Sequence, residues 1–207
     1  FSALEIFIVN FFEMSKKFHW ELKNYDYPFK RDLVTVIMPV YNGQYTIEKA
    51  IRSILLQTYC ELEVIVVDDA STDETTKVVK RLMNNENRLK LIEFSENRGV
   101  YAARNEAINN SIGVVIANQD ADDISLINRI EKQLIPIYEK GMLFTTARIY
   151  RSRLEVDDLD VDDQKGMMDL VESRRILNKY GKYDYQDRPI IGLQTSVFRR
   201  SIFEQFG

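Results

Sequence analysis

The chain has 207 residues, of which 45% are hydrophobic and 29% are charged, as in an ordinary globular domain. The formal net charge of −4 argues against a nucleic-acid partner, because a protein that binds phosphate backbones usually carries a basic face. The single cysteine, Cys60, excludes an internal disulfide framework and a cysteine-based metal cluster. No apolar run approaches the about 20 residues that a membrane-spanning helix needs.

The N-terminal segment predicts a helix that precedes the main domain. Residues 3–23 carry apolar side chains at the spacing of one helical face, and the pattern breaks at residues 24–28. We therefore predict a helical extension, or the end of a preceding domain, over residues 1–30. Packing on the main domain is favoured over a membrane-surface role, because only Lys16 and Lys17 offer a basic polar face.

Downstream of this helix, short apolar runs alternate with segments of helical periodicity. The predicted strands cover residues 33–38, 63–67, 89–94 and 114–117, and the predicted helices cover residues 46–57, 71–83 and 100–109. Thr46 is the expected N-cap of the first helix, and Ser71 and Glu74 have capping-box spacing at the second. This alternation predicts an α/β fold with a parallel sheet and helices on both faces.

The strand ends carry the functional information, because parallel α/β sheets bind ligands at the carboxyl ends of their strands. Those ends read Pro39-Val40-Tyr41-Asn42, Asp68-Asp69, Asn97-Arg98-Gly99 and Asp120-Ala121-Asp122-Asp123. An aromatic ring can stack on a base, an aspartate can accept a hydrogen bond from it, and Asp122 can hold a divalent cation against a diphosphate. Together they predict a nucleotide pocket, with helix capping by the aspartates and turn packing of Tyr41 as the alternative.

These segments resemble the conserved blocks of family 2 glycosyltransferases. The similar segments are residues 36–42, 53–58, 63–73, 97–99, 103–105 and 120–123, with a further match at residues 194–206. The block at residues 120–123 is similar to the Asp-x-Asp motif of that family. The resemblance implies the GT-A fold, a Rossmann-like and mostly parallel sheet with helices on both faces.

The resemblance also implies roles for residues of the nucleoside pocket. Pro39 and Tyr41 would line that pocket, with Tyr41 against a uracil ring. Asp69 would contact the base, and Asp68 would help to position it.

The remaining donor contacts implied by the resemblance lie closer to the diphosphate. Asp120 would approach the ribose or the sugar, and Asp122 would coordinate Mn²⁺ or Mg²⁺. Arg98 and Arg104 are candidates for further donor contacts, with surface salt bridges as the alternative.

The same resemblance divides the chain and leaves the catalytic base unassigned. Residues 31–137 would form the nucleotide-sugar-binding half, and residues 138–207 part of an acceptor-side half that is truncated. In relatives a carboxylate base follows the block that resembles residues 199–201, so we expect it beyond Gly207. Residues 138–193 contain a predicted strand at 143–150, an acidic run at 154–163 expected to be a solvated loop, and a predicted helix at 167–180.

We therefore predict a metal-dependent enzyme that transfers a sugar from a UDP-sugar to a glycan or glycoconjugate acceptor with inversion. We expect a cytoplasmic location, with peripheral association at the inner face of a membrane or further domains of a longer chain as open alternatives. The alternative functions are a catalytically inactive GT-A module that binds nucleotide sugar or glycan, and a nucleotidyltransferase. The last is disfavoured because it would need a glycine-rich, basic phosphate loop where this chain has residues 39–42.

Overall fold

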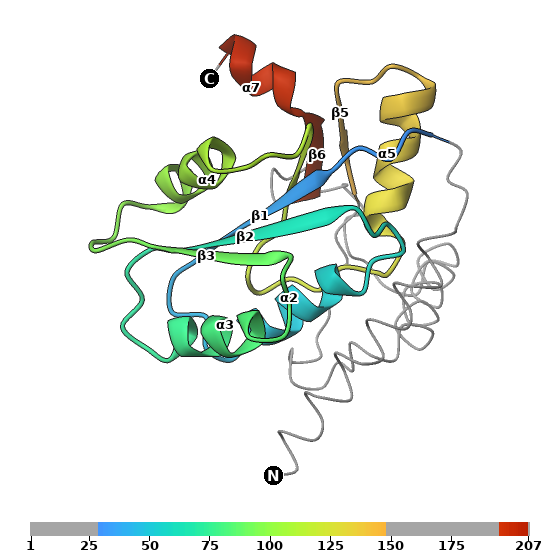
Figure 1. The fold of residues 1–207 in the computed structure, drawn as a ribbon. Coiled ribbons are helices and arrows are strands. Elements are labelled where there is room, and N and C mark those ends of the chain that lie inside the picture. The colour runs from blue at the N-terminus through green and yellow to red at the C-terminus, as the bar shows by residue number, and fades with distance from the viewer. Residues whose placement is uncertain (1–28, 148–194, 207) are drawn as a thin grey trace, which may run out of the picture.

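The computed structural model describes residues 29–147 and 195–206, which form one six-stranded sheet with helices on both faces (Figure 1). The strands are β1 (Val34–Val40), β2 (Leu62–Asp68), β3 (Leu89–Glu93), β4 (Val115–Asn118), β5 (Phe144–Thr146) and β6 (Ser196–Arg199). The helices are α2 (Ile47–Leu55), α3 (Thr75–Met83), α4 (Val100–Asn109), α5 (Arg129–Glu139) and α7 (Arg200–Phe206). The N-terminal helix, the acidic run and the helix at 167–180 that the sequence predicts lie outside the described residues.

The sheet has the strand order β3-β2-β1-β4-β6-β5 and is mostly parallel. β1 is central and pairs in parallel with β2 and with β4, and β2 pairs in parallel with β3. β6 runs antiparallel to both β4 and β5. The predicted α/β fold is confirmed, and the first four predicted strands agree with the structure to within two residues at each end.

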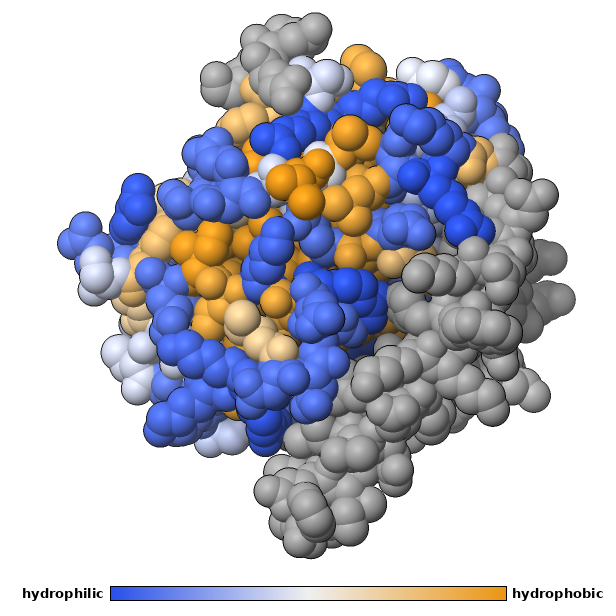
Figure 2. Space-filling model, in the orientation of Figure 1, coloured by the Kyte–Doolittle hydropathy of each residue, from blue (hydrophilic) through white to orange (hydrophobic). Residues whose placement is uncertain are grey.

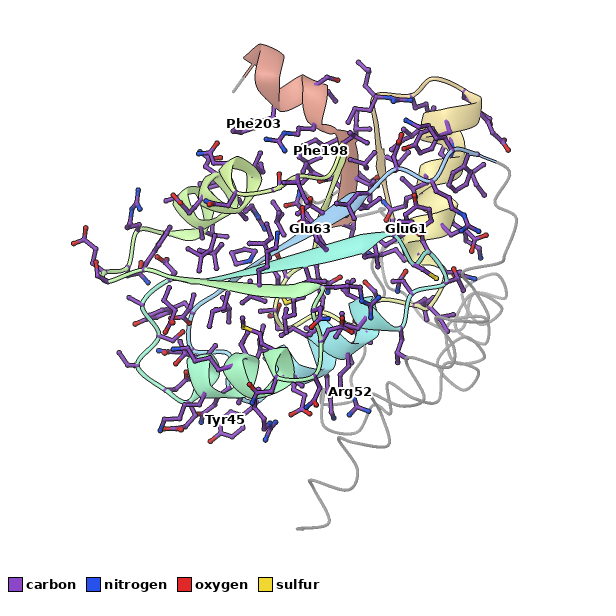
Figure 3. All side chains as sticks on the ribbon, viewed as in Figure 1. Tyr45, Arg52, Glu61, Glu63, Phe198 and Phe203 are labelled. Carbon is purple, nitrogen blue, oxygen red and sulfur yellow. The ribbon has the colours of Figure 1, made fainter. Side chains whose placement is uncertain are left out.

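Two apolar layers hold the helices to the sheet. On one face α2, α3 and α5 pack against the strands through side chains that include Ile51, Leu82 and Leu134. On the other face the small Ala103 and Ala107 of α4 lie in a second cluster. Phe198 and Phe203 pack against that second cluster from β6 and α7 (Figure 3). Each fully buried aliphatic side chain contributes about 1.5–3 kcal/mol to this packing.

The predicted start of α3 needs correction. α3 begins at Thr75, and its N-cap residue Glu74 makes no side-chain cap bond. The predicted capping box is wrong because Ser71 Oγ instead accepts a hydrogen bond from Asn42 N at 2.8 Å, across to the loop after β1. Thr46 is the N-cap residue of α2 as predicted, but it makes no side-chain cap bond either.

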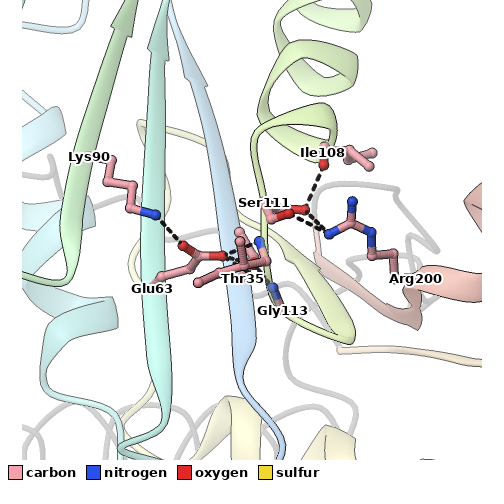
Figure 4. A network of polar contacts seen from close by, with 8 residues as sticks. Thr35, Glu63, Lys90, Ile108, Ser111, Gly113 and Arg200 are labelled. Carbon is pink, nitrogen blue, oxygen red and sulfur yellow. Dashed lines mark hydrogen bonds and ion pairs between the residues drawn. The ribbon is translucent and has the colours of Figure 1, made fainter.

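A buried polar network anchors the amino ends of the central strands (Figure 4). Glu63 Oε1 accepts hydrogen bonds from Thr35 Oγ1, from Ile112 N at 2.8 Å and from Gly113 N at 3.2 Å. Glu63 Oε2 pairs with Lys90 Nζ at 2.8 Å. Burial raises the pKa of Glu63, but the hydrogen bonds from Lys90, Thr35 and Ile112 N outweigh it, and the pKa lies below its ordinary value. A Cβ on Gly113 would lie 2.6 Å from Thr35 N, so only glycine lets the chain enter β4 this close to β1.

Among the described strands β3 lies at one edge of the sheet, and charged side chains protect this edge. Leu91 and Ile92 are half-buried there, and Lys90 and Glu93 are exposed between the apolar positions, which discourages pairing with another strand. Figure 2 shows apolar side chains reaching the surface of this view with hydrophilic residues around them. Within the described ranges, no helix is long and apolar enough to cross a membrane.

Candidate functional site

The carboxyl ends of β1, β2 and β4 lie at one edge of the sheet because β1 pairs in parallel with both β2 and β4. Val40 is in register with Asp68, and Ile37 is in register with Asn118. Gln119 N extends the second pairing by donating to Ile37 O at 3.1 Å. The segments that follow the three strands begin at Tyr41, Asp69 and Gln119, and they therefore meet at this edge, which we call the rim. The sequence predicts this meeting for its aspartates and its tyrosine.

The aromatic residue predicted to stack on a base is accessible. Tyr41 directly follows β1, and 52% of its surface is exposed. Pro39 lies two residues earlier inside β1, where it is buried and in register with Val67. The ring of Tyr41 is thus free to cover a planar ligand, whereas Pro39 is buried within β1.

Asp69 ties the end of β2 to the loop that precedes α4. Its carboxylate is buried and accepts from Arg98 N at 2.7 Å through Oδ1 and from Gly99 N at 2.8 Å through Oδ2. Asn97 Nδ2 donates to the carbonyl oxygen of Asp69 at 3.3 Å. Each carboxylate oxygen keeps a second lone pair that can accept a hydrogen bond from a ligand. The contact of Asp69 with a base stays a prediction.

Asp68 keeps an acceptor that the described residues do not use. Its Oδ2 accepts from Ser71 N at 3.0 Å, whereas its Oδ1 is buried without a hydrogen-bond partner among them. An unsatisfied buried acceptor costs about 1–3 kcal/mol, and a donor group brought by a ligand would recover that energy.

The two arginines predicted to contact the donor differ in their surroundings. Arg98 is exposed, and its guanidinium carbon lies 4.5 Å from the centre of the Phe94 ring. Arg104 projects from α4 and pairs its Nη2 with Asp120 Oδ1 at 2.9 Å. Arg104 therefore forms a salt bridge within the rim, and its contact with the donor stays a prediction.

The acidic segment after β4 concentrates negative charge. Burial raises the pKa of Asp120, the Arg104 guanidinium lowers it, and the neighbouring Asp122 raises it, with a net increase. Burial also raises the pKa of Asp123, and both other aspartates add to the increase. Asp122 is exposed. Because Asp120 is paired with Arg104 and Asp122 is exposed, Asp122 is the carboxylate of this segment that is most accessible to a cation.

The donor set at the rim fits a magnesium-like or manganese-like ion that a ligand helps to hold. The described part of the chain contains no group of three or more histidine, cysteine or acidic side chains arranged as a metal cage. Mg²⁺ typically binds one or two carboxylates together with substrate phosphates, and hard carboxylate oxygens of the Asp120–Asp122 type also suit Mn²⁺. The mutual repulsion of the three aspartates would fall on binding such an ion.

Gln119 braces the acidic segment, and the sequence did not single it out. Its Nε2 donates to the carbonyl oxygens of Asp120 at 3.0 Å and of Asp123 at 2.8 Å. Its Oε1 accepts from Ser125 Oγ at 2.6 Å. The sequence signal that could have pointed to Gln119 is a polar residue at the end of a buried strand.

The aspartates of this segment do not cap the next helix, which was the alternative prediction for them. The chain forms a turn at Asp122 and reaches α5 only at Arg129. Asp123 N donates to Asp120 O at 3.3 Å, and Gln119 holds the Asp123 carbonyl, so the segment folds back on itself before the helix.

A buried cation lies behind the acidic segment. Arg129 Nη1 donates to Asn118 O at 3.2 Å, while its Nε and Nη2 have no hydrogen-bond partner among the described residues. Burial lowers the pKa of Arg129 to about 10 against an opposing effect of Asp123, so the side chain stays charged at neutral pH. Its charge offsets part of the repulsion among the three aspartates.

Comparison with known proteins gives one family. The family model described as "Glycosyl transferase family 2" matches residues 35–207. The chain is 38% identical over 112 residues to the UDP-Glc:alpha-D-GlcNAc-diphosphoundecaprenol beta-1,3-glucosyltransferase WfgD of Escherichia coli, a match that covers 54% of this chain and 44% of that protein. The chain spans less than half of the length of the curated relatives it matches.

Solved structures show the same fold. The mannosyltransferase PcManGT from Pyrobaculum calidifontis in complex with GDP-Man and Mn²⁺ aligns with a TM-score of 0.60 and 26% identity, covering 99% of this chain and 58% of that one. Residues 1–349 of S. aureus TarS in complex with UDP-GlcNAc align with a TM-score of 0.61 and 21% identity, covering 84% of this chain and 47% of that one.

Proposed function

The chain belongs to glycosyl transferase family 2 and has the GT-A fold, and on this premise we propose that it carries the donor-binding half of a sugar-transferring enzyme. The enzyme would move a sugar from a UDP-sugar to a carbohydrate or glycoconjugate acceptor with inversion at the anomeric carbon. We propose residues 31–137 as the donor-binding half and residues 138–207 as part of the acceptor-side half.

The observation that carries this proposal is the meeting of one exposed aromatic ring and a set of aspartates at a single rim. Tyr41 would stack on the uracil, and Asp69, supported by Asp68, would accept from the base. Arg104 and Asp120, already paired at 2.9 Å, would orient the ribose or the sugar. Arg98, one residue from Gly99, is the further cation that could reach the donor.

Asp122 would hold Mn²⁺ or Mg²⁺ at the diphosphate, because it is the exposed carboxylate of the acidic segment. A bound cation would neutralise the negative charge that develops on the leaving nucleoside diphosphate. Arg104 would keep Asp120 paired when the ion binds, and Gln119 fixes the backbone on both sides of Asp122.

We propose that the general base is a carboxylate beyond Gly207, which would remove the proton from the acceptor hydroxyl. The E. coli relative is named for a glucosyl transfer to a sugar carried by diphosphoundecaprenol. A lipid-linked acceptor of that kind would be consistent with action at the cytoplasmic face of a membrane.

Calorimetry of UDP with and without Mn²⁺ tests the donor site. We expect UDP to bind, Mn²⁺ to strengthen the binding, and Asp122→Ala to remove the metal dependence. Glu139→Ala removes an exposed carboxylate at the end of α5 and serves as the matched control, with unchanged binding. Metal-independent UDP binding by the wild type, or metal-dependent binding by Asp122→Ala, would show the assignment to be wrong.

Release of UDP from a panel of UDP-sugars tests the activity. A chain extended past Gly207 should release UDP in the presence of an acceptor. Binding without turnover in that chain would favour the inactive nucleotide-sugar-binding module.

A further inference from the structure

The loops after β1 and β2 are joined to each other beyond the end of the sheet. The last backbone bond between the two strands runs from Asp69 N to Val40 O at 2.8 Å. Past it, three consecutive backbone amides of the first loop donate to side chains of the second loop and of the first residue of α3. These bonds run from Asn42 N to Ser71 Oγ at 2.8 Å, from Gly43 N to Thr75 Oγ1 at 2.8 Å and from Gln44 N to Asp73 Oδ2 at 3.1 Å.

The second loop returns the same kind of bond. Thr72 N donates to Asn42 Oδ1 at 2.8 Å, and Thr72 Oγ1 also approaches that oxygen at 3.3 Å. Glu74 N donates to Gln44 Oε1 at 2.9 Å. Side chains thus replace the backbone carbonyls that a longer sheet would have used, and both loops become one rigid unit.

The backbone of Asn42 fits this arrangement. Its φ of 53° lies in the left-handed region, which asparagine adopts more readily than most residues. This conformation turns the chain directly after Tyr41 and brings the Asn42 amide oxygen to the Thr72 amide.

The joined loops fix the position of the backbone that carries the exposed ring of Tyr41. More than half of the surface of Tyr41 is exposed, so packing alone holds it weakly. Its backbone is fixed instead, on one side by β1 and on the other by Asn42. A ring that is already in place loses less conformational entropy when a base stacks on it.

We propose that Asn42 is a positioning residue for the nucleoside, acting through its bond to Thr72 to hold Tyr41 in the stacking position. This inference rests on the proposed function, because it takes Tyr41 as the platform for the base. Asn42 itself does not contact the ligand in this proposal. The bonds between the loops also argue against a capping role for Ser71. Its hydroxyl accepts from the first loop and not from the amides of α3.

Two substitutions of Asn42 separate the side chain from the backbone. Asn42→Gly keeps the left-handed conformation and removes the amide oxygen, whereas Asn42→Asp keeps an acceptor oxygen for the Thr72 amide. Hydrogen exchange of residues 70–75 reports on the joined loops, and calorimetry of UDP and of pyrophosphate with Mn²⁺ reports on the two ends of the donor.

We expect Asn42→Gly to speed exchange at Thr72 and to weaken UDP binding about fivefold, which corresponds to the loss of one hydrogen bond of about 1 kcal/mol. Pyrophosphate binding should be unchanged, because that end depends on Asp122. Asn42→Asp should restore both exchange protection and UDP affinity to within about twofold of the wild type.

The outcomes that would overturn the proposal are distinct. Unchanged UDP affinity in Asn42→Gly despite faster exchange at Thr72 would show that the joined loops do not position the base. Equal weakening of UDP and pyrophosphate would indicate general destabilisation instead. A wild-type protein that binds pyrophosphate but not UDP would reject the proposed function, and the positioning role would fall with it.

Discussion

The two ends of the parallel strands both bury carboxylates, but their surroundings are opposite. At the amino ends, Glu63 has a hydrogen-bond donor for each oxygen, and its pKa is lowered. At the carboxyl ends, the pKa values of Asp120 and Asp123 are raised. Five buried polar atoms there have no hydrogen-bond partner among the described residues, namely Asp68 Oδ1, Asn118 Oδ1, Arg104 Nε, and Arg129 Nε and Nη2.

This difference separates stability from binding. A network whose members are all satisfied has already used its hydrogen-bonding capacity, so a ligand could add little to it. A rim with crowded charges and unused donors and acceptors gains free energy when a ligand supplies counter-charges and partners. The amino end of the sheet thus holds β4 in place, and in the proposed function its carboxyl end would bind the donor.

The largest effect on stability is expected from Glu63→Ala. The substitution leaves the Thr35 hydroxyl, the Lys90 ammonium and the Ile112 amide without their acceptor, at a cost of about 3 kcal/mol. Thermal unfolding should show Tm lower by roughly 6–12 °C. Well below that temperature, UDP and Mn²⁺ should bind with unchanged affinity. If Glu63→Ala weakened UDP binding as strongly as Asp122→Ala does, the two ends would not be independent.

Gln119→Ala should affect both stability and binding. It removes three hydrogen bonds at the acidic segment, with a loss of about 2 kcal/mol, and should weaken Mn²⁺-dependent UDP binding about tenfold because Asp122 is no longer held. Gln57 is the matched control, since its buried amide also makes three bonds. Gln57→Ala should lower Tm similarly and leave the metal dependence unchanged. A similar loss of UDP affinity in both variants would remove the special role of Gln119.

Ala70→Gly should stabilise the protein, because Ala70 has a φ of 62° at the rim. A non-glycine residue in this region costs about 1 kcal/mol, so Tm should rise by roughly 2–4 °C. Ala102→Gly, the same change inside α4, should lower Tm by a similar amount. A lower Tm for Ala70→Gly would mean that the rim does not carry this strain.

The smallest effect is expected from Asp123→Asn, and it depends on pH. Because the pKa of Asp123 is raised on folding from 3.8, the stability that it contributes is present below 3.8 and is lost as the pH rises through the folded value. At neutral pH, Asp123→Asn should therefore raise Tm by about 1–2 °C, the shift that roughly 0.5 kcal/mol gives in a chain of this size.

The gain from Asp123→Asn should shrink as the pH is lowered toward 3.8. Glu63→Gln gives the opposite sign, because the lowered pKa of Glu63 adds stability above 4.5 that is lost as the pH falls through the folded value. Melting curves of both variants across this range check the two directions. A destabilising effect of Asp123→Asn at neutral pH would contradict the repulsion among the aspartates.

The alternation of strands and helices, the position of the aspartates at strand ends and the family resemblance were all readable from the sequence. Hydrophobic periodicity is a local property, and it predicts Val100–Asn109 as a helix with the bounds that the structure has. The family blocks are short and continuous, so they too need no tertiary contact to be recognised.

Only the tertiary structure decided what the polar side chains of the rim contact. Ser71 was predicted to cap its own helix, yet it bonds to Asn42, 29 residues away in sequence. Asp69 holds amides 29 and 30 residues away, and Gln119 braces the segment that it precedes. A short polar side chain can satisfy its hydrogen bonds with any donor or acceptor that the fold brings near, so its partner depends on the arrangement of the strands and not on its neighbours in sequence.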